Sequence, residues 1–234
     1  MAPVASRKRK RALPAVWSLR RRERPYRERG IVLLAGVDEV GVSPLAGPVV
    51  AAAVIMPPDS AIRGVNDSKK VLCEAMRDEL AGRIREEAVA FAVGMARPRE
   101  IDRVNIYQAS LRAMARAVLR LSIRPELLLV DARTVPGIDV PQEGHVGGDG
   151  LFYQIACASL VAKVYRDTLM RRLDRKYPAY GFAKHKGYPT PEHCAALARV
   201  GPCFIHRRGY RRVAETAQGD LFAEGRLERA EAER

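Results

Sequence analysis

The sequence predicts an α/β fold in which helices flank a mixed sheet, and three observations support this. Short apolar runs rich in Val, Ala, Leu and Ile alternate with segments that repeat apolar residues at helical spacing. Gly and Pro mark the boundaries between them. The chain has 234 residues, 47% of them hydrophobic, which is enough for one ordinary core. Because strands come first in a local pair and are then mixed with helices, we expect a layered α/β domain.

The predicted strands are apolar runs bounded by turn residues. They span residues 31–40, 49–56, 89–96, 127–132 and, as a short strand or turn, 144–150. A Gly/Pro turn joins the first two. The run LLLVDA ends in an acid, and GHVGGDG ends in another.

The predicted helices carry apolar residues every three or four positions. They span residues 71–88, 98–121 and 151–175, with a short helix beginning near Pro191. The first places Leu72, Met76, Leu80 and Ile84 on one face. We expect a break in the second helix near Asn105, and a Gly/Pro/Tyr loop over residues 177–190.

Charge divides the chain into three parts. The formal net charge is +14, and residues 1–30 contribute +9 of it, so we expect a basic, disordered arm there. Residues 215–234 form an acidic tail of net charge −3, which leaves +8 for the single domain expected over residues 31–214. Such a balance favours a polyanionic partner, above all nucleic acid, although a solvated charge run would give the same count.

Several classes of protein are disfavoured by the composition. No apolar run approaches the roughly 18 residues of a membrane span, and the basic N-terminus lacks the apolar segment of a signal peptide. The four cysteines have no C-x-x-C spacing, and the four histidines complete no zinc pattern. We therefore expect a soluble, cytoplasmic protein with reduced thiols, acting as a monomer away from membranes.

Acidic residues end the predicted strands. They are Asp38, Glu39, Asp131 and Asp149. Strand ends of an open sheet are where sites form, and oxygen-only ligands suit Mg²⁺ or Mn²⁺. Neighbouring residues on a strand point to opposite faces, so Asp38 and Glu39 share a site only if the strand twists or ends there. Any one acid could be an ordinary loop residue, but repetition at three strand ends in a basic chain favours a metal site.

Seven motifs carry a resemblance to a known family. They are GVDEVG-x-x-PLAGPVVAAAV from residue 36, NDSKK at 66–70, LLVDA at 128–132, GGD at 147–149, ACASLVAKVYRD at 156–167, YGFAKHKGYPT at 180–190 and IHRRGY at 205–210. In order and spacing they resemble ribonuclease HII, the type 2 ribonuclease H that nicks DNA at embedded ribonucleotides. The resemblance extends from about residue 33 to 214.

The resemblance implies a fold and an activity. The fold is a ribonuclease H-like mixed sheet flanked by helices, with a small helical C-terminal region. The catalytic residues are the four carboxylates, which would bind two Mn²⁺ or Mg²⁺ ions. The enzyme would cleave RNA/DNA hybrids and ribonucleotide-containing duplex DNA at the phosphate 5′ of a ribonucleotide, leaving a 3′-hydroxyl and a 5′-phosphate.

The sequence departs from the family pattern beside the metal site. The family has a Gly-Arg-Gly turn that touches the ribose 2′-hydroxyl, and here the turn is Gly41-Val42-Ser43. Val42 lacks an arginine's donors, and Ser43 resists the positive φ that glycine tolerates. Gly147 replaces a lysine that is frequent in the family, and Phe152 and Tyr153 are bulkier than expected.

Further binding residues follow from the resemblance. Expected substrate contacts are Gly41, Val42, Ser43, Lys69, Lys70 and Tyr188, and Lys163 and Asp167 are expected to support the metal site from outside. Tyr188 could instead be a packed loop tyrosine, and Lys69 and Lys70 could be solvated lysines. Lys163 and Asp167 could form a plain i,i+4 ion pair on one helix. His185 and His206 are either phosphate contacts or structural residues. The peptide QGDLF, Gln218–Phe222, resembles the motif by which bacterial replication proteins bind the sliding clamp.

Three functions remain open from the sequence. The first is the metal-dependent endoribonuclease described above. The second keeps that chemistry but cleaves hybrids with weakened junction specificity, because Val42 and Ser43 replace Arg-Gly. The third is a nucleic-acid-binding protein with impaired catalysis, which the four retained carboxylates disfavour. A metal-independent nuclease has no visible nucleophile–base pair.

Overall fold

A five-stranded mixed sheet forms the centre of the computed structural model, which describes residues 15–65 and 73–216. Its strands are β1 (Leu34–Val40), β2 (Val49–Ile55), β3 (Ala90–Ala96), β4 (Leu127–Asp131) and β5 (Gln142–His145). The spatial order is β3-β2-β1-β4-β5. β1 pairs antiparallel with β2 and parallel with β4, so the sheet changes from antiparallel to parallel at β1.

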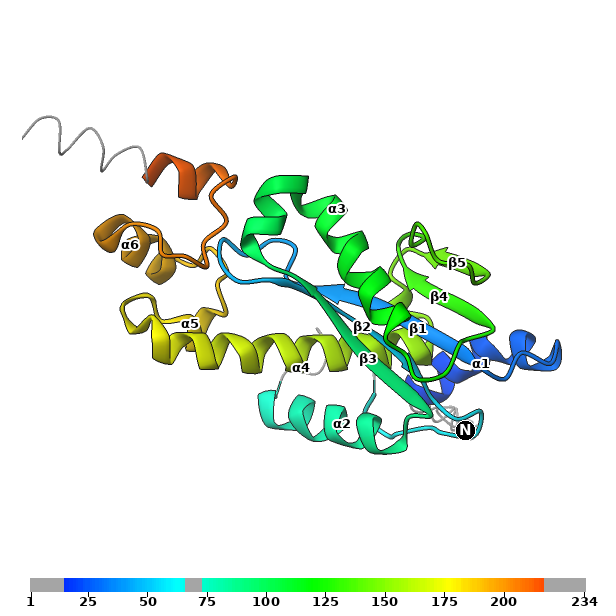
Figure 1. The fold of residues 1–234 in the computed structure, drawn as a ribbon. Helices are drawn as coiled ribbons and strands as arrows, with labels where there is room; N and C mark the ends of the chain where they lie inside the picture. Colours follow the sequence, from blue (N-terminus) through cyan, green and yellow to red (C-terminus); the bar gives the residue numbers. More distant parts are fainter. Residues whose placement is uncertain (1–14, 66–72, 217–234) are drawn as a thin grey trace, which may run out of the picture.

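Helices cover both faces of this sheet (Figure 1). They are α1 (Ala15–Glu28), α2 (Glu74–Glu87), α3 (Pro98–Leu119), α4 (Tyr153–Lys176), α5 (Phe182–His185) and α6 (Pro191–Val200). α3 packs on one face, and α4 with α2 and α1 packs on the other (Figure 1). The short helices α5 and α6 follow at one end, so the predicted α/β fold with a small helical C-terminal region is confirmed. In residues 15–65 and 73–216, no helix combines the length and apolar character needed to cross a membrane.

The central strands are buried on both sides. Along β2, Ala51 and Ala53 pack with α3, whereas Ala52 and Val54 pack with α4. This alternation of period two explains why the strand is an unbroken apolar run. On β1, a Cβ placed at Gly36 would lie 2.0 Å from the carbonyl carbon of Gln154, so only glycine lets β1 approach α4 this closely.

The predicted disordered arm is wrong for residues 15–28, which form α1. Val16 and Leu19 are buried in the core that α4 and β2 share, and Glu23 is fully buried beside them. These three residues lie on one helical face at spacings of three and four, which the many arginines between them obscure. Burial of this face stabilises α1 despite the internal Pro25.

The unexpectedly bulky pair at the start of α4 contacts this helix. The Phe152 ring lies 6.3 Å from the Tyr26 ring in an edge-on arrangement. The Arg20 guanidinium lies 5.4 Å from the Tyr153 ring centroid, a cation–π distance. Residues 152 and 153 are therefore part of the surface on which α1 packs.

Other differences from the predicted elements are local. Met76 is 51% exposed, so the buried face of α2 begins at Leu80. β5 ends at His145, and Asp149 lies in a 3-10 turn rather than at a strand end. The chain turns at Gly147, which has a φ of 68°. The predicted break at Asn105 is confirmed by its φ of 68° inside α3.

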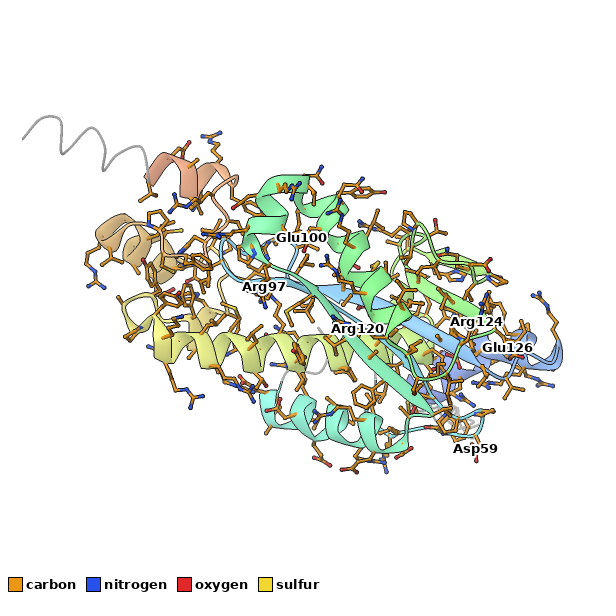
Figure 2. The ribbon with its side chains drawn as sticks, in the orientation of Figure 1. Asp59, Arg97, Glu100, Arg120, Arg124 and Glu126 are labelled. Carbon is orange, nitrogen blue, oxygen red and sulfur yellow. The ribbon has the colours of Figure 1, made fainter. Side chains whose placement is uncertain are left out.

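Edge strand β3 is capped by arginines of α3. Arg120 donates to the Val93 carbonyl at 3.1 Å, and Arg116 donates to the Met95 carbonyl at 2.7 Å. Arg116 also forms a two-point contact with Glu100 of α3. Glu100 lies in the first turn of α3, and Arg120 follows its last residue (Figure 2). Because these side chains occupy carbonyls at an edge strand, they hinder pairing with another chain there.

Candidate active site

One hollow of about 570 Å³ is lined by all four predicted carboxylates. Asp38 and Glu39 lie near the end of β1, Asp131 ends β4, and Asp149 lies in the turn before α4. β1 and β4 are parallel neighbours, so their carboxyl ends meet at the same edge of the sheet. The structure thus brings together the acids that the sequence places far apart.

The end of the β1–β4 ladder explains how adjacent acids reach one hollow. The last aligned pair is Val37 with Val130, and Asp38 and Asp131 are the next residues on each strand. Beyond this pair β1 remains bonded to β2, with Glu39 opposite Ala51 in its register, while its other edge is released from β4. Both carboxylates can therefore line the opening.

Electrostatic repulsion is built into this cluster. Asp38 is only 5% exposed, and burial raises its pKa well above the usual range, as do Glu39 and Asp131. The Ser159 hydroxyl opposes the shift through a hydrogen bond to Asp38. Burial also raises the pKa of Glu39, against the attraction of the Arg133 guanidinium 3.8 Å away. Such a cluster takes up either protons or cations.

The donor set fits a hard divalent cation. All four groups are carboxylates, and the hollow has no thiol or imidazole among its described lining residues. Oxygen-only ligation suits Mg²⁺ or Mn²⁺. Within residues 15–65 and 73–216, no three acidic, His or Cys side chains already have the arrangement of a formed metal site. Asp131 accepts a 2.7 Å hydrogen bond from the Gly148 amide through Oδ1, which orients this carboxylate at the end of β4.

The same hollow also contains most of the predicted substrate residues that the structure describes. Gly41, Val42, Ser43 and Tyr188 all line the hollow. Lys163 also lines it, with its Nζ 5.8 Å from the Tyr188 ring centroid and 2.9 Å from Asp167 Oδ1. Asp167 is buried behind Lys163.

Sequence reasoning missed a further cation at this site. Arg77 of α2 lines the hollow beside the carboxylates. No motif marks Arg77, because α2 reaches the site only through tertiary packing. Its neighbour Glu74 forms ion pairs with Arg171 and Lys186, which fixes the first turn of α2 beside the site.

The remaining predicted residues fall into two groups, those outside the described part of the chain and two buried histidines. Lys69, Lys70 and Gln218–Phe222 lie outside the described residues. His185 and His206 are buried, and His206 bonds to His193 at 3.1 Å between their Nε2 atoms. Burial, with the neighbouring histidines, lowers the pKa of His206 to about 4, so it is neutral near pH 7. These contacts fit the structural alternative for both histidines.

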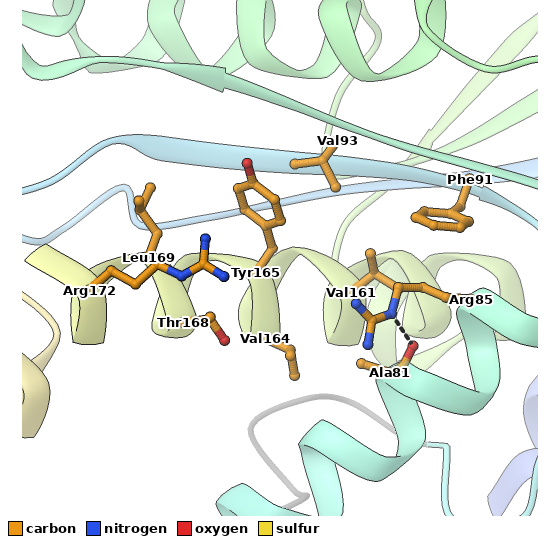
Figure 3. Close-up of a pocket in the computed structure, with 10 residues that line it drawn as sticks. All are labelled: Ala81, Arg85, Phe91, Val93, Val161, Val164, Tyr165, Thr168, Leu169 and Arg172. Atoms are coloured by element: carbon orange, nitrogen blue, oxygen red, sulfur yellow. Dashed lines mark hydrogen bonds between the residues drawn. The ribbon is translucent and has the colours of Figure 1, made fainter.

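A second hollow lies between α2, β3 and α4 (Figure 3). Its lining includes Phe91, Tyr165, Arg85 and Arg172. Arg85 donates a hydrogen bond to the Ala81 carbonyl of its own helix (Figure 3). No carboxylate occurs among its described lining residues, so it lacks the groups that make the first hollow reactive.

Known proteins share much of this sequence. The sequence profile of ribonuclease HII matches residues 35–213. A ribonuclease HII of Myxococcus xanthus is 54% identical over 188 residues, which cover 80% of this chain and 64% of that protein. The match thus spans slightly less than two thirds of the relative's length.

Solved structures share the fold. The ribonuclease H2 of Pyrococcus horikoshii superposes with a TM-score of 0.70 at 24% identity, covering 79% of this chain and 97% of that one. The Archaeoglobus fulgidus ribonuclease HII, solved in a complex with PCNA, gives 0.63 at 27% identity, covering 75% and 92%. The profile match alone covers most of the chain, and this chain therefore belongs to the ribonuclease HII family of type 2 ribonucleases H.

Proposed function

We propose that this chain is a divalent-metal-dependent endoribonuclease that cleaves the RNA strand of RNA/DNA hybrids and nicks duplex DNA 5′ of embedded ribonucleotides. The observation that carries the proposal is the meeting of four carboxylates, one aromatic ring and two cations in a single hollow. Carboxylates alone would repel a nucleic acid, so this mixture fits a site that binds metal and phosphate together. The products would be a 5′-phosphate and a 3′-hydroxyl.

Metal binding is assigned to Asp38, Glu39, Asp131 and Asp149. Two Mn²⁺ or Mg²⁺ ions bound there would activate the attacking water and stabilise the leaving oxygen. The protein's part is to hold four anions in one place. Because Asp38 has a raised pKa, it is ionised most readily when a cation replaces the proton, so metal binding should release protons.

The other lining residues of the hollow would hold the nucleic acid. We assign Tyr188 to the sugar beside the cleavage point, because a planar ring packs on a flat deoxyribose and detects added bulk. Lys163 and Arg77 line the same hollow and would contact phosphates. We also propose Lys69 and Lys70, which precede α2 in the sequence, as phosphate contacts, and Asp167 as a support for Lys163.

A second candidate keeps the chemistry and relaxes the substrate. The Val42 side chain is 39% exposed and lines the hollow where the family places an arginine. Its methyl groups cannot donate to a 2′-hydroxyl. This observation favours a hybrid-cleaving enzyme with weakened junction specificity.

Cleavage of two labelled 20-mer duplexes separates the candidates. One carries a single ribonucleotide in DNA, the other is a full RNA/DNA hybrid, and both are tested in Mg²⁺ and in Mn²⁺ with Asp149→Asn as the blank. Incision 5′ of the lone ribonucleotide supports the first candidate, and cleavage of the hybrid alone supports the second. Binding without cleavage of either would contradict both.

We also propose that Gln218–Phe222 binds a sliding clamp. The complex of the Archaeoglobus fulgidus relative with PCNA supports this kind of partner. Deletion of residues 218–222 should remove clamp binding in surface plasmon resonance and leave cleavage of short duplexes unchanged. Equal clamp binding by the full chain and the deletion would contradict the assignment.

A further inference from the structure

Two fully buried arginines surround the turn between β1 and β2. Arg166 comes from the middle of α4, and Arg207 from the segment that follows α6, and both are 0% exposed. The turn they enclose, residues 41–48, contains the Gly41-Val42-Ser43 departure from the family pattern. Neither arginine lines the hollow that holds the carboxylates.

Arg207 holds the first half of the turn. Its Nη2 donates to the Gly41 carbonyl at 2.5 Å, and its Nη1 donates to the Val42 carbonyl at 2.7 Å. Its Nε donates to the Gly47 carbonyl at 3.0 Å, across the turn. The Tyr210 hydroxyl accepts from Arg207 Nη1 at 2.9 Å and donates to the Val42 carbonyl at 2.7 Å. The Val42 carbonyl therefore has two donors.

Arg166 holds the second half and joins it to another segment. Its Nη2 and Nε donate to the carbonyls of Ala46 and Pro48 at 3.1 and 3.0 Å. Its Nη1 donates to the Lys186 carbonyl at 3.0 Å, and its guanidinium carbon lies 5.7 Å from the Tyr188 ring centroid. Arg166 thus bonds to the turn and to the loop that carries Tyr188.

A direct contact also joins the turn to that loop. The Leu45 amide donates to the Gly187 carbonyl at 2.9 Å. A Cβ on Gly187 would lie 2.5 Å from the Ala46 carbonyl oxygen, so the two backbones are in contact. The two segments expected to contact the nucleotide therefore form one unit.

The hydrogen bonds that Arg166 and Arg207 donate to the turn require arginine. Among the described hydrogen bonds of Arg166 and Arg207, every acceptor is a backbone carbonyl or the Tyr210 hydroxyl, and none is a carboxylate. Buried cations without an anionic partner are costly, and burial lowers the pKa of Arg166 to about 10. A planar guanidinium offers five donors in a fixed fork, which lysine cannot reproduce.

We propose that Arg166 and Arg207 are positioning residues for substrate recognition, which hold Gly41-Val42-Ser43 against the nucleotide so that the turn contacts it through its backbone. Gly41 and Gly47 supply the positive φ of the turn, and two distant side chains then hold it in place through its carbonyls. This explains how valine and serine can stand where the family has Arg-Gly while the turn still faces the carboxylates. The inference rests on the proposed function.

The test compares binding of two duplexes that differ in one 2′-hydroxyl. An Asp149→Asn background prevents turnover, and fluorescence anisotropy gives the Kd of a single-ribonucleotide duplex and of the all-DNA duplex of the same sequence. The variants are Arg207→Lys and the milder Tyr210→Phe, which keeps the ring and removes the donor to Val42. The matched control is Tyr165→Phe, since Tyr165 lies in the separate groove of Figure 3. Hydrogen–deuterium exchange of peptides covering residues 41–48 reports on the turn itself.

We expect the unaltered turn to favour the ribonucleotide duplex. Tyr210→Phe should reduce that preference about threefold to tenfold, as for removal of one hydrogen bond, and Arg207→Lys about tenfold or more. Both should speed exchange over residues 41–48, and Tyr165→Phe should change neither readout. The inference would be overturned if the preference for the ribonucleotide duplex survived faster exchange of the turn. It would also be overturned if the variants did not speed exchange over residues 41–48, or if the unaltered turn showed no preference. Failure of the proposed function is seen separately, as no cleavage of either duplex by the unsubstituted chain.

Discussion

Glu23 of α1 accepts a 2.8 Å hydrogen bond, through Oε1, from the backbone amide of Gln154 in the first turn of α4. The two residues are 131 positions apart, and both are fully buried. The residue before α4, Phe152, offers no side-chain cap, so Glu23 satisfies an amide that would otherwise be unpaired. Since α4 carries Ser159, Lys163 and Arg166, α1 supports the helix on which one wall of the site depends.

Removal of this acceptor should destabilise the fold. Glu23→Ala leaves the Gln154 amide buried without a partner, which costs about 1–3 kcal/mol. Glu23→Gln keeps an acceptor oxygen and removes a buried charge, so its free energy of unfolding should lie closer to that of the unsubstituted chain. Urea denaturation measures the free energy of unfolding of the unsubstituted chain and of the two variants. Equal destabilisation of the Ala and Gln variants would show that the charge, held near Arg20 and Arg27, matters more than the hydrogen bond.

The same residue predicts a pH dependence. Burial raises the pKa of Glu23 above its ordinary value of 4.5, against the Gln154 amide and the nearby arginines. The folded state therefore binds the proton more tightly than the unfolded state does. Its contribution to stability is fully present below pH 4.5 and is lost as the pH rises through the raised folded pKa. The difference in unfolding free energy between the unsubstituted chain and Glu23→Gln, measured from pH 4 to 8, should follow this direction.

Truncations should separate the N-terminal segment into two functions. Residues 1–14 carry five Lys or Arg and no acid, so their deletion should reduce the slope of log affinity against log salt by up to about 0.9 for each phosphate that they neutralise. The melting temperature should not change. Deletion of residues 1–28 also removes the buried Val16 and Leu19, and should lower the melting temperature. Equal melting temperatures for the two truncations would contradict the docking of α1.

Asp38 should be unfavourable for stability and necessary for activity. Asp38→Asn removes a buried, repelled charge, so in EDTA the variant should be more stable by about 0.5–2 kcal/mol. Added Mn²⁺ should stabilise the unsubstituted chain by about 2.7 kcal/mol at 100 times its Kd, and the variant much less. Cleavage should fall by more than about 100-fold. Asp139→Asn, on the surface, is the control and should change none of these readings.

Restoring an arginine should sharpen substrate choice. Val42→Arg places five donors beside the hollow and should raise the preference for a single-ribonucleotide duplex over the all-DNA duplex of the same sequence by about 1–3 kcal/mol. Val89→Arg is the matched control, because Val89 is also 39% exposed and does not line this hollow. The ratio of the two Kd values, measured in the Asp149→Asn background, reports the effect. An equal change in the Val42→Arg and Val89→Arg variants would show that the effect comes from the added charge alone.

Much of the fold follows from local pattern. Strands β1 to β4 occur where apolar runs meet turn residues, and the break at Asn105 occurs where the helical pattern weakens. The acids that line the site were found because Asp38, Glu39 and Asp131 close such runs. Asp149 lies in a turn after β5, which is the second of the two alternatives that the sequence offers for residues 144–150. Motif order then supplied the family, which the comparisons confirm.

The sequence by itself determined the layered α/β fold, the four acids and the family, because these depend on periodicity and on spacing along the chain. The tertiary structure alone decided that α1 docks, that Arg77 reaches the site and that Arg166 and Arg207 enclose the turn. Arg207 and Gly41 are 166 residues apart, and no local pattern links them. Hydrogen bonds to backbone carbonyls place no demand on the identity of the residue that accepts them, so only the fold reveals which carbonyls a buried arginine meets.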